Sequence, residues 1–105
     1  MNIVELKTNW RNISLSKRKN YESNFVSYDF VKAHGTEVAH ETHSVLISYE
    51  NKDIISIRDW LSSRCSGKYR LLARFDLNDK KVSYIGVNHC FDDQNDAALF
   101  KLMFS

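Results

Sequence analysis

The second half of the chain alternates apolar segments with turn signals, and its clearest segment is helical. Apolar residues recur there at spacings of three and four, as on the buried face of a helix, at Ile54, Ile57, Leu61 and Cys65. Asn51 or Asp53 can cap the first turn, and Gly67 stands where a left-handed residue commonly ends a helix. The pattern therefore predicts a helix from Asp53 to Ser66.

Segments of alternating polarity lie on both sides of this helix. His43 to Tyr49 carries apolar side chains at every second position, which predicts a strand before the helix. Tyr69 to Leu77 alternates in the same way, and Asn78 to Lys81 is a turn. Val82 to Phe91 then pairs naturally with its predecessor, so we expect an antiparallel hairpin.

The C-terminal segment leaves two interpretations open. Asp92 and Asp93 can cap a short helix through Ala97 to Leu99, since acidic groups stabilise the positive end of a helix. Phe100 to Phe104 has an apolar residue at every second position, as in a strand. Both a last strand and a helix that continues to the C-terminal residues fit this segment.

The order strand, helix, strand, strand, helix and then a possible strand predicts an α+β fold. We expect a ferredoxin-like or related antiparallel sheet with two helices packed on one face. Residues 1–105 are expected to form a single domain, with 43–105 as its compact core and 1–42 as a less regular part. In that part Ile3 to Leu6 and Phe25 to Phe30 are candidate strands.

Several residues of the second half also carry a resemblance. They are Asp59-Trp60-Leu61, Cys65, Gly67-Lys68-Tyr69, Phe91-Asp92-Asp93 and the run from Asp96 to Phe104. This half resembles small uncharacterised proteins of tailed bacteriophages, including phages of cyanobacteria, that end in an acidic turn, an Asp-Ala helix and a Phe-Lys-Leu-x-Phe segment. The resemblance implies a phage origin, and it carries over no catalytic residue.

Composition and cysteine content exclude several classes of protein. With 43% apolar and 27% charged residues, the chain has the composition of a folded domain rather than of a disordered one. Two cysteines are too few for a disulfide framework, and we expect a reducing, cytoplasmic setting in a host cell. Since no apolar run approaches the length of a spanning helix, we expect no membrane insertion.

The strongest electrostatic signal is a basic segment near the N-terminus. From Lys7 to Lys19 the chain has basic residues and no acid, and Trp10 lies among them. Lys and Arg side chains bind phosphates, while Trp10 and Tyr21 could stack on unpaired bases. A formal net charge of +2 is small for a nucleic-acid-binding protein, so a solvated basic loop also explains the segment.

Residues with catalytic or metal-binding chemistry are scattered. His34, His40 and His43 could bind a metal ion, but His40-Glu41-Thr42-His43 is one residue short of a H-E-x-x-H motif. His89 and Cys90 are adjacent, so on a strand they point to opposite faces and cannot form a dyad. We therefore expect no enzyme, no cofactor and no metal, with the three histidines as weak candidates.

Two functions remain as hypotheses. We expect first a small phage-encoded protein that binds and modulates a host or phage protein, because Trp and Arg are enriched at binding hot spots. The alternative is a single-stranded nucleic-acid-binding protein that uses the segment from Lys7 to Tyr21. The sequence leaves the oligomeric state open. Both hypotheses use the same candidate contact residues, namely Trp10, Arg11, Lys17, Arg18, Lys19 and Tyr21.

Overall fold

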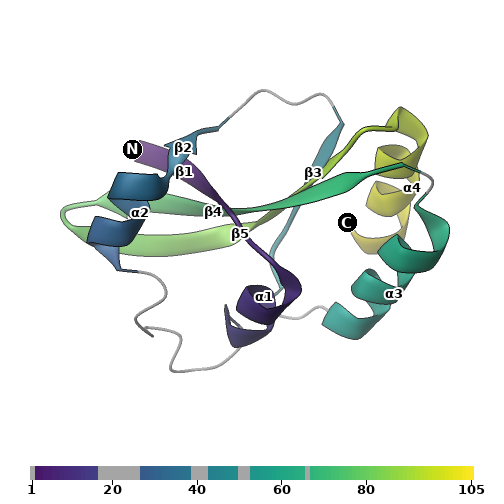
Figure 1. The fold of residues 1–105 in the computed structure, drawn as a ribbon, viewed down its shortest axis with the longest axis horizontal. Coiled ribbons are helices and arrows are strands. Elements are labelled where there is room, and N and C mark those ends of the chain that lie inside the picture. Colours follow the sequence, from purple (N-terminus) through teal and green to yellow (C-terminus); the bar gives the residue numbers. More distant parts are fainter. Residues whose placement is uncertain (1, 17–26, 39–42, 50–52, 66) are drawn as a thin grey trace.

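Strands from both halves of the chain form one antiparallel sheet, and helices pack on it (Figure 1). A computed structural model describes residues 2–16, 27–38, 43–49, 53–65 and 67–105. The described strands lie in the order β2-β1-β4-β5-β3. In chain order the elements are β1 (Asn2–Lys7), α1 (Trp10–Ser16), α2 (Tyr28–His34), β2 (Thr36–Glu37), β3 (Ser44–Ile47), α3 (Ile54–Arg64), β4 (Tyr69–Asn78), β5 (Lys81–Phe91) and α4 (Gln94–Phe104).

The long hairpin of β4 and β5 forms the centre of the sheet, as the alternation of the sequence predicted. Along β4 the buried side chains are those of Leu71, Ala73, Phe75 and Leu77, at every second position. Asp79 and Lys80 connect the two strands with positive φ angles of 49° and 59°, the conformation of a type I′ turn. A register shift between Arg74 and Phe75 places a bulge in the partner strand β5.

The topology of residues 44–91 is the split βαβ arrangement expected from the sequence. Strands β3 and β4 both pair antiparallel with β5, so they run parallel to each other and α3 connects them. The N-terminal strand β1 pairs antiparallel with the other edge of β4, and β2 pairs with β1. The α+β class is thus confirmed, and β1 extends the sheet on the side of β4.

All four described helices contribute buried residues to the same face of the sheet. Leu71 belongs to a cluster with Ile13 of α1, Ile57 of α3 and Phe100 of α4. Farther along the same face of β4, Phe75 packs in a second cluster with Val31 of α2. Residues two apart on a strand share a face, so Leu71 and Phe75 lie on the face of β4 that the helices cover. The two clusters do not extend to the opposite face of β4.

The ends of α3 and α4 show how short polar side chains position the helices. Asp53 caps α3 and accepts from Ile55 N at 3.0 Å, and Asp93 caps α4 and accepts from Asn95 N at 2.7 Å. The prediction of a left-handed Gly67 was wrong, since no described glycine has a positive φ. Instead α3 ends in an extended Cys65, and Gly67 N donates to the buried Asp96 carboxylate at 2.9 Å.

The C-terminal residues form a helix, so the helical one of the two interpretations left open by the sequence is correct. Phe100 is fully buried, and its ring lies 5.7 Å from Trp60 and 5.1 Å from Phe104. A distance of 5.1 Å between these two ring centroids fits residues one helical turn apart, because residues four apart on a strand are separated by about 13 Å. Packing against α3 therefore selects the helical period, and it leaves Leu102 exposed.

The N-terminal part contains one of the two strands predicted for it. Ile3 to Leu6 lies within β1, as expected. The predicted strand Phe25 to Phe30 is wrong from Tyr28 onward, where helix α2 begins, and residues 25–26 lie outside the described residues. Ser27 caps this helix and accepts from Phe30 N at 3.1 Å, which explains the helical start. None of the helices in the described ranges is long and apolar enough to cross a membrane.

Candidate functional site

The basic and aromatic segment singled out in the sequence begins at the end of β1. Trp10 is the first residue of α1 and is half-buried against the core, whereas Arg11 is exposed. Trp10 is therefore neither a fully exposed anchor nor a wholly buried core residue. Four other predicted contact residues, namely Lys17, Arg18, Lys19 and Tyr21, lie outside the described residues.

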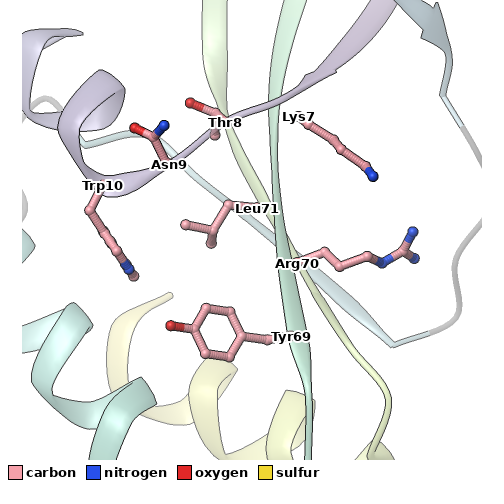
Figure 2. Close-up of a pocket in the computed structure, with 7 residues that line it drawn as sticks. All are labelled: Lys7, Thr8, Asn9, Trp10, Tyr69, Arg70 and Leu71. Atoms are coloured by element: carbon pink, nitrogen blue, oxygen red, sulfur yellow. The ribbon is translucent and has the colours of Figure 1, made fainter.

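Trp10 lies in a cavity of about 400 Å³ where β1 leads into α1 (Figure 2). We call it the Trp10 cavity. Its volume falls in the range of about 300–1,000 Å³ that is usual for ligand sites. The residues that line it come from β1, the link to α1, α1 itself and the start of β4: Lys7, Thr8, Asn9, Trp10, Tyr69, Arg70 and Leu71.

Backbone contacts hold the wall of the Trp10 cavity in place. Thr8 N donates to Leu71 O at 3.0 Å, which fixes the link between β1 and α1 on β4. The side chain of Asn9 accepts from Asn12 N at 3.0 Å and so caps α1. Ile13, one turn after the cap, is buried and anchors the helix. The first residue of α1, which is the tryptophan, is thereby positioned by the fold.

The Trp10 cavity has an aromatic side and a cationic side. In Figure 2 the rings of Trp10 and Tyr69 lie on one side of β4 with Leu71, and Lys7 and Arg70 extend on the other. The register explains this division, because Lys7 is paired with Leu72 and therefore shares a face with Arg70. No acidic side chain is among the described residues that line this cavity.

A second cavity of about 610 Å³ shares Lys7 and Arg70 with the first. We call it the Glu37 cavity. It extends from the two cations towards α1, α2 and β2. Its lining residues are Glu5, Leu6, Lys7, Asn12, Phe30, His34, Thr36, Glu37, Arg70 and Leu72.

The two carboxylates of the Glu37 cavity lie in different surroundings. Glu5 is buried and paired in register with Arg74, whose Nη2 lies 3.3 Å from Glu5 Oε2. This cross-strand ion pair compensates the buried charge of Glu5. Glu37 at the end of β2 is exposed, and Phe30 and His34 of α2 line the cavity with their ring centroids 4.6 Å apart.

Of the three histidines considered as metal ligands, the structure describes two, and they lie on different segments of the chain. His34 is exposed on α2, His43 is half-buried just before β3, and His40 lies outside the described residues. Within the described ranges no group of three or more His, Cys, Asp or Glu side chains could hold a metal ion.

The cysteines and the remaining histidine also show no activated pair among the described residues. Burial and a hydrogen bond to the Asp96 carboxylate raise the pKa of the Cys65 thiol to about 11, so this thiol stays protonated at neutral pH. Cys90 is buried, and its neighbour His89 points to the opposite face of β5, where its ring contacts Phe100. His89 also bonds to the hydroxyl of Tyr49.

Three residues of the Trp10 cavity were missed as site residues in the sequence. Lys7 belongs to the predicted basic segment but was not selected, and Tyr69 and Arg70 were assigned only to a strand. Pairing of β1 with β4 brings Lys7 close to Tyr69 and Arg70, which lie more than sixty residues later in the sequence. The sequence shows only that basic and aromatic residues lie at the end of one predicted strand and at the start of another.

Comparison of the chain with protein-family models, with curated proteins and with solved structures finds no match in any of the three.

Proposed function

We propose that this protein binds single-stranded nucleic acid at the Trp10 cavity. The observation that carries this proposal is the division of the cavity into an aromatic side, Trp10 and Tyr69, and a cationic side, Lys7 and Arg70. A base stacks on an aromatic ring while the phosphate beside it takes a cation, and one nucleotide presents both groups to the protein.

Unpaired strands fit this geometry better than a duplex. In a duplex the bases are stacked on one another, so an aromatic side chain reaches a base face only after unstacking. Stacking on a protein ring contributes about 1–3 kcal/mol per base and tolerates any base, because every base has a π-face. The absence of an acid among the described lining residues favours phosphate at the Trp10 cavity.

The test measures binding of fluorescein-labelled eight-nucleotide DNA and RNA of mixed sequence by anisotropy at several salt concentrations. Lys7→Ala and Arg70→Ala are each expected to weaken binding severalfold and to reduce the slope of log affinity against log salt by about 0.7, the value for one phosphate on a single strand. Lys101→Ala removes a lysine that is exposed on α4 and serves as the control.

The aromatic side has a spectroscopic test of its own. The chain has two tryptophans, so Trp60→Phe leaves Trp10 as the single tryptophan reporter. Addition of the oligonucleotide should quench its fluorescence, because a stacked base quenches indole emission. Salt-independent binding, or binding without quenching and with unchanged affinity in Lys7→Ala, would contradict the proposal.

Docking on a protein is a second candidate, and exposed apolar side chains on α4 favour it. Leu99, Leu102 and Met103 are 51%, 81% and 60% exposed and lie on one side of this helix at spacings of three and four. Capture from a nuclease-treated host lysate should give a partner that the parent retains and Leu102→Ser loses. Loss of all captured material after nuclease treatment would contradict docking and support nucleic-acid binding.

The resemblance to small tailed-phage proteins supports the same setting for both candidates. We propose a phage-encoded protein that acts without catalysis in the cytoplasm of a host cell, on a strand or on a host or phage protein. What supports this setting is the sequence of the second half of the chain, from Asp59 to Phe104.

A further inference from the structure

The two cavities are joined by a pair of cations. Lys7 and Arg70 line the Trp10 cavity and also the Glu37 cavity. The register places both side chains on the face of β4 opposite to the helix clusters. In a nucleic-acid strand one phosphate lies between two successive bases, so a cation pair flanked by two cavities has the same order of groups.

We infer that the Glu37 cavity takes the base next to the one in the Trp10 cavity, and that it selects bases that carry an amino group where thymine and uracil carry the O4 carbonyl oxygen. The inference rests on the proposed function, since it requires a strand in the Trp10 cavity. It adds a site size of at least two nucleotides and a preference for cytosine or adenine over thymine or uracil.

The volume of the Glu37 cavity and the aromatic rings that line it are suitable for a nucleic-acid base. Its volume of about 610 Å³ exceeds that of the Trp10 cavity. Phe30 of α2 is 44% exposed and lines this cavity together with His34, with the two ring centroids 4.6 Å apart. A large apolar ring at the wall of a cavity is a suitable surface for a base, and stacking gains affinity without selecting a particular base.

Selection comes from the carboxylate of Glu37. A carboxylate only accepts hydrogen bonds, so it pairs with the amino group of cytosine or adenine and repels the carbonyl oxygen that thymine and uracil present there. Glu5 lines the same cavity, but its carboxylate is held by Arg74. Glu37 is exposed at the end of β2, which leaves it accessible to the edge of a base.

The experiment compares the affinity for six-nucleotide homopolymers, C6 against T6 as DNA and C6 against U6 as RNA. A hydrogen bond between a charged and a neutral group corresponds to a preference of about tenfold for cytosine. Glu37→Gln should reduce this preference to about onefold, because an amide donates as well as accepts. Asp79→Asn makes the same change of charge in the β4–β5 turn and should keep the preference of the parent.

The outcomes separate the inference from the function on which it rests. Tenfold tighter binding of C6 that disappears in Glu37→Gln and persists in Asp79→Asn supports the inference. Equal binding of C6 and T6, or a preference that survives in Glu37→Gln, overturns the inference and leaves the proposed function standing. No binding of any homopolymer, under conditions where circular dichroism shows a folded protein, overturns both.

Discussion

The buried imidazole of His89 makes the stability of the fold depend on pH. His89 is fully buried, its Nδ1–H donates to Val45 O at 3.2 Å, and its Nε2 accepts from the Tyr49 hydroxyl at 2.5 Å. Both ring nitrogens are therefore used by the neutral form. Burial lowers the pKa of His89 to about 4, against the opposing effect of backbone hydrogen bonds with Val45 and Val87.

The sign and size of the effect follow from linkage. In the unfolded chain a histidine has a pKa of about 6.5. Between pH 6.5 and 4 the unfolded state therefore binds a proton that the folded state does not, so the free energy of unfolding falls as the pH falls. With the folded pKa of His89 at about 4, the loss is about 2 kcal/mol from pH 7.5 to 5 and about 3 kcal/mol at pH 4.

Urea denaturation followed by circular dichroism at pH 7.5, 6, 5 and 4 measures this loss. His89→Gln keeps an acceptor for the Tyr49 hydroxyl and cannot titrate, so its stability should depend less on pH than that of the parent by the amounts above. His34→Gln removes an exposed imidazole of α2 and controls for the loss of a histidine as such. If the parent and His89→Gln lose stability in parallel, or if the His89 ring titrates near pH 6.5 in the folded protein by NMR, the reasoning is refuted.

Two further predictions concern the hairpin turn and the partly buried thiol. Lys80→Gly should stabilise the protein by about 0.5–1 kcal/mol in urea denaturation, because Asp79 and Lys80 both have positive φ and glycine adopts this conformation without a Cβ penalty; a lower midpoint would contradict this account of the turn. With Cys90 replaced by serine, Cys65 should react with Ellman's reagent at pH 8 roughly 20-fold more slowly than free cysteine, since its pKa is raised to about 11. In the same Cys90→Ser background, Asp96→Asn should accelerate this reaction by removing the nearby negative charge. A Cys65 rate equal to that of free cysteine before this second change would contradict the assigned hydrogen bond.

Local signals in the sequence were sufficient for the parts of the fold with a clear period. The helix that begins after Asp53 and the hairpin around Asp79 combine a strong period with capping or turn residues, and both are confirmed. The segment from Phe100 to Phe104 fits period two as well as a helical spacing of four. Only contact with Trp60 of α3 decides between them, and that contact is not local.

The candidate site was predictable only in part, for a related reason. Trp10 and the basic character of its segment are visible in the sequence. Tyr69 and Arg70 become part of the same cavity through the register of β1 against β4, in which Lys7 lies opposite Leu72. A strand pattern predicts which face a residue occupies, but it does not predict which distant strand lies beside it.

The position of Trp10 decides how function can be separated from stability in this protein. Its indole packs against the core cluster and also lines the cavity, so a change at Trp10 alters folding and binding together. Lys7 and Arg70 are exposed on the opposite side of β4 and do not belong to that cluster. If Lys7→Ala loses binding and keeps the unfolding midpoint of the parent, the loss is therefore an effect on ligand binding and not on folding. The same loss in Trp10→Ala would be evidence for the site only after the unfolding midpoint had been shown to be unchanged.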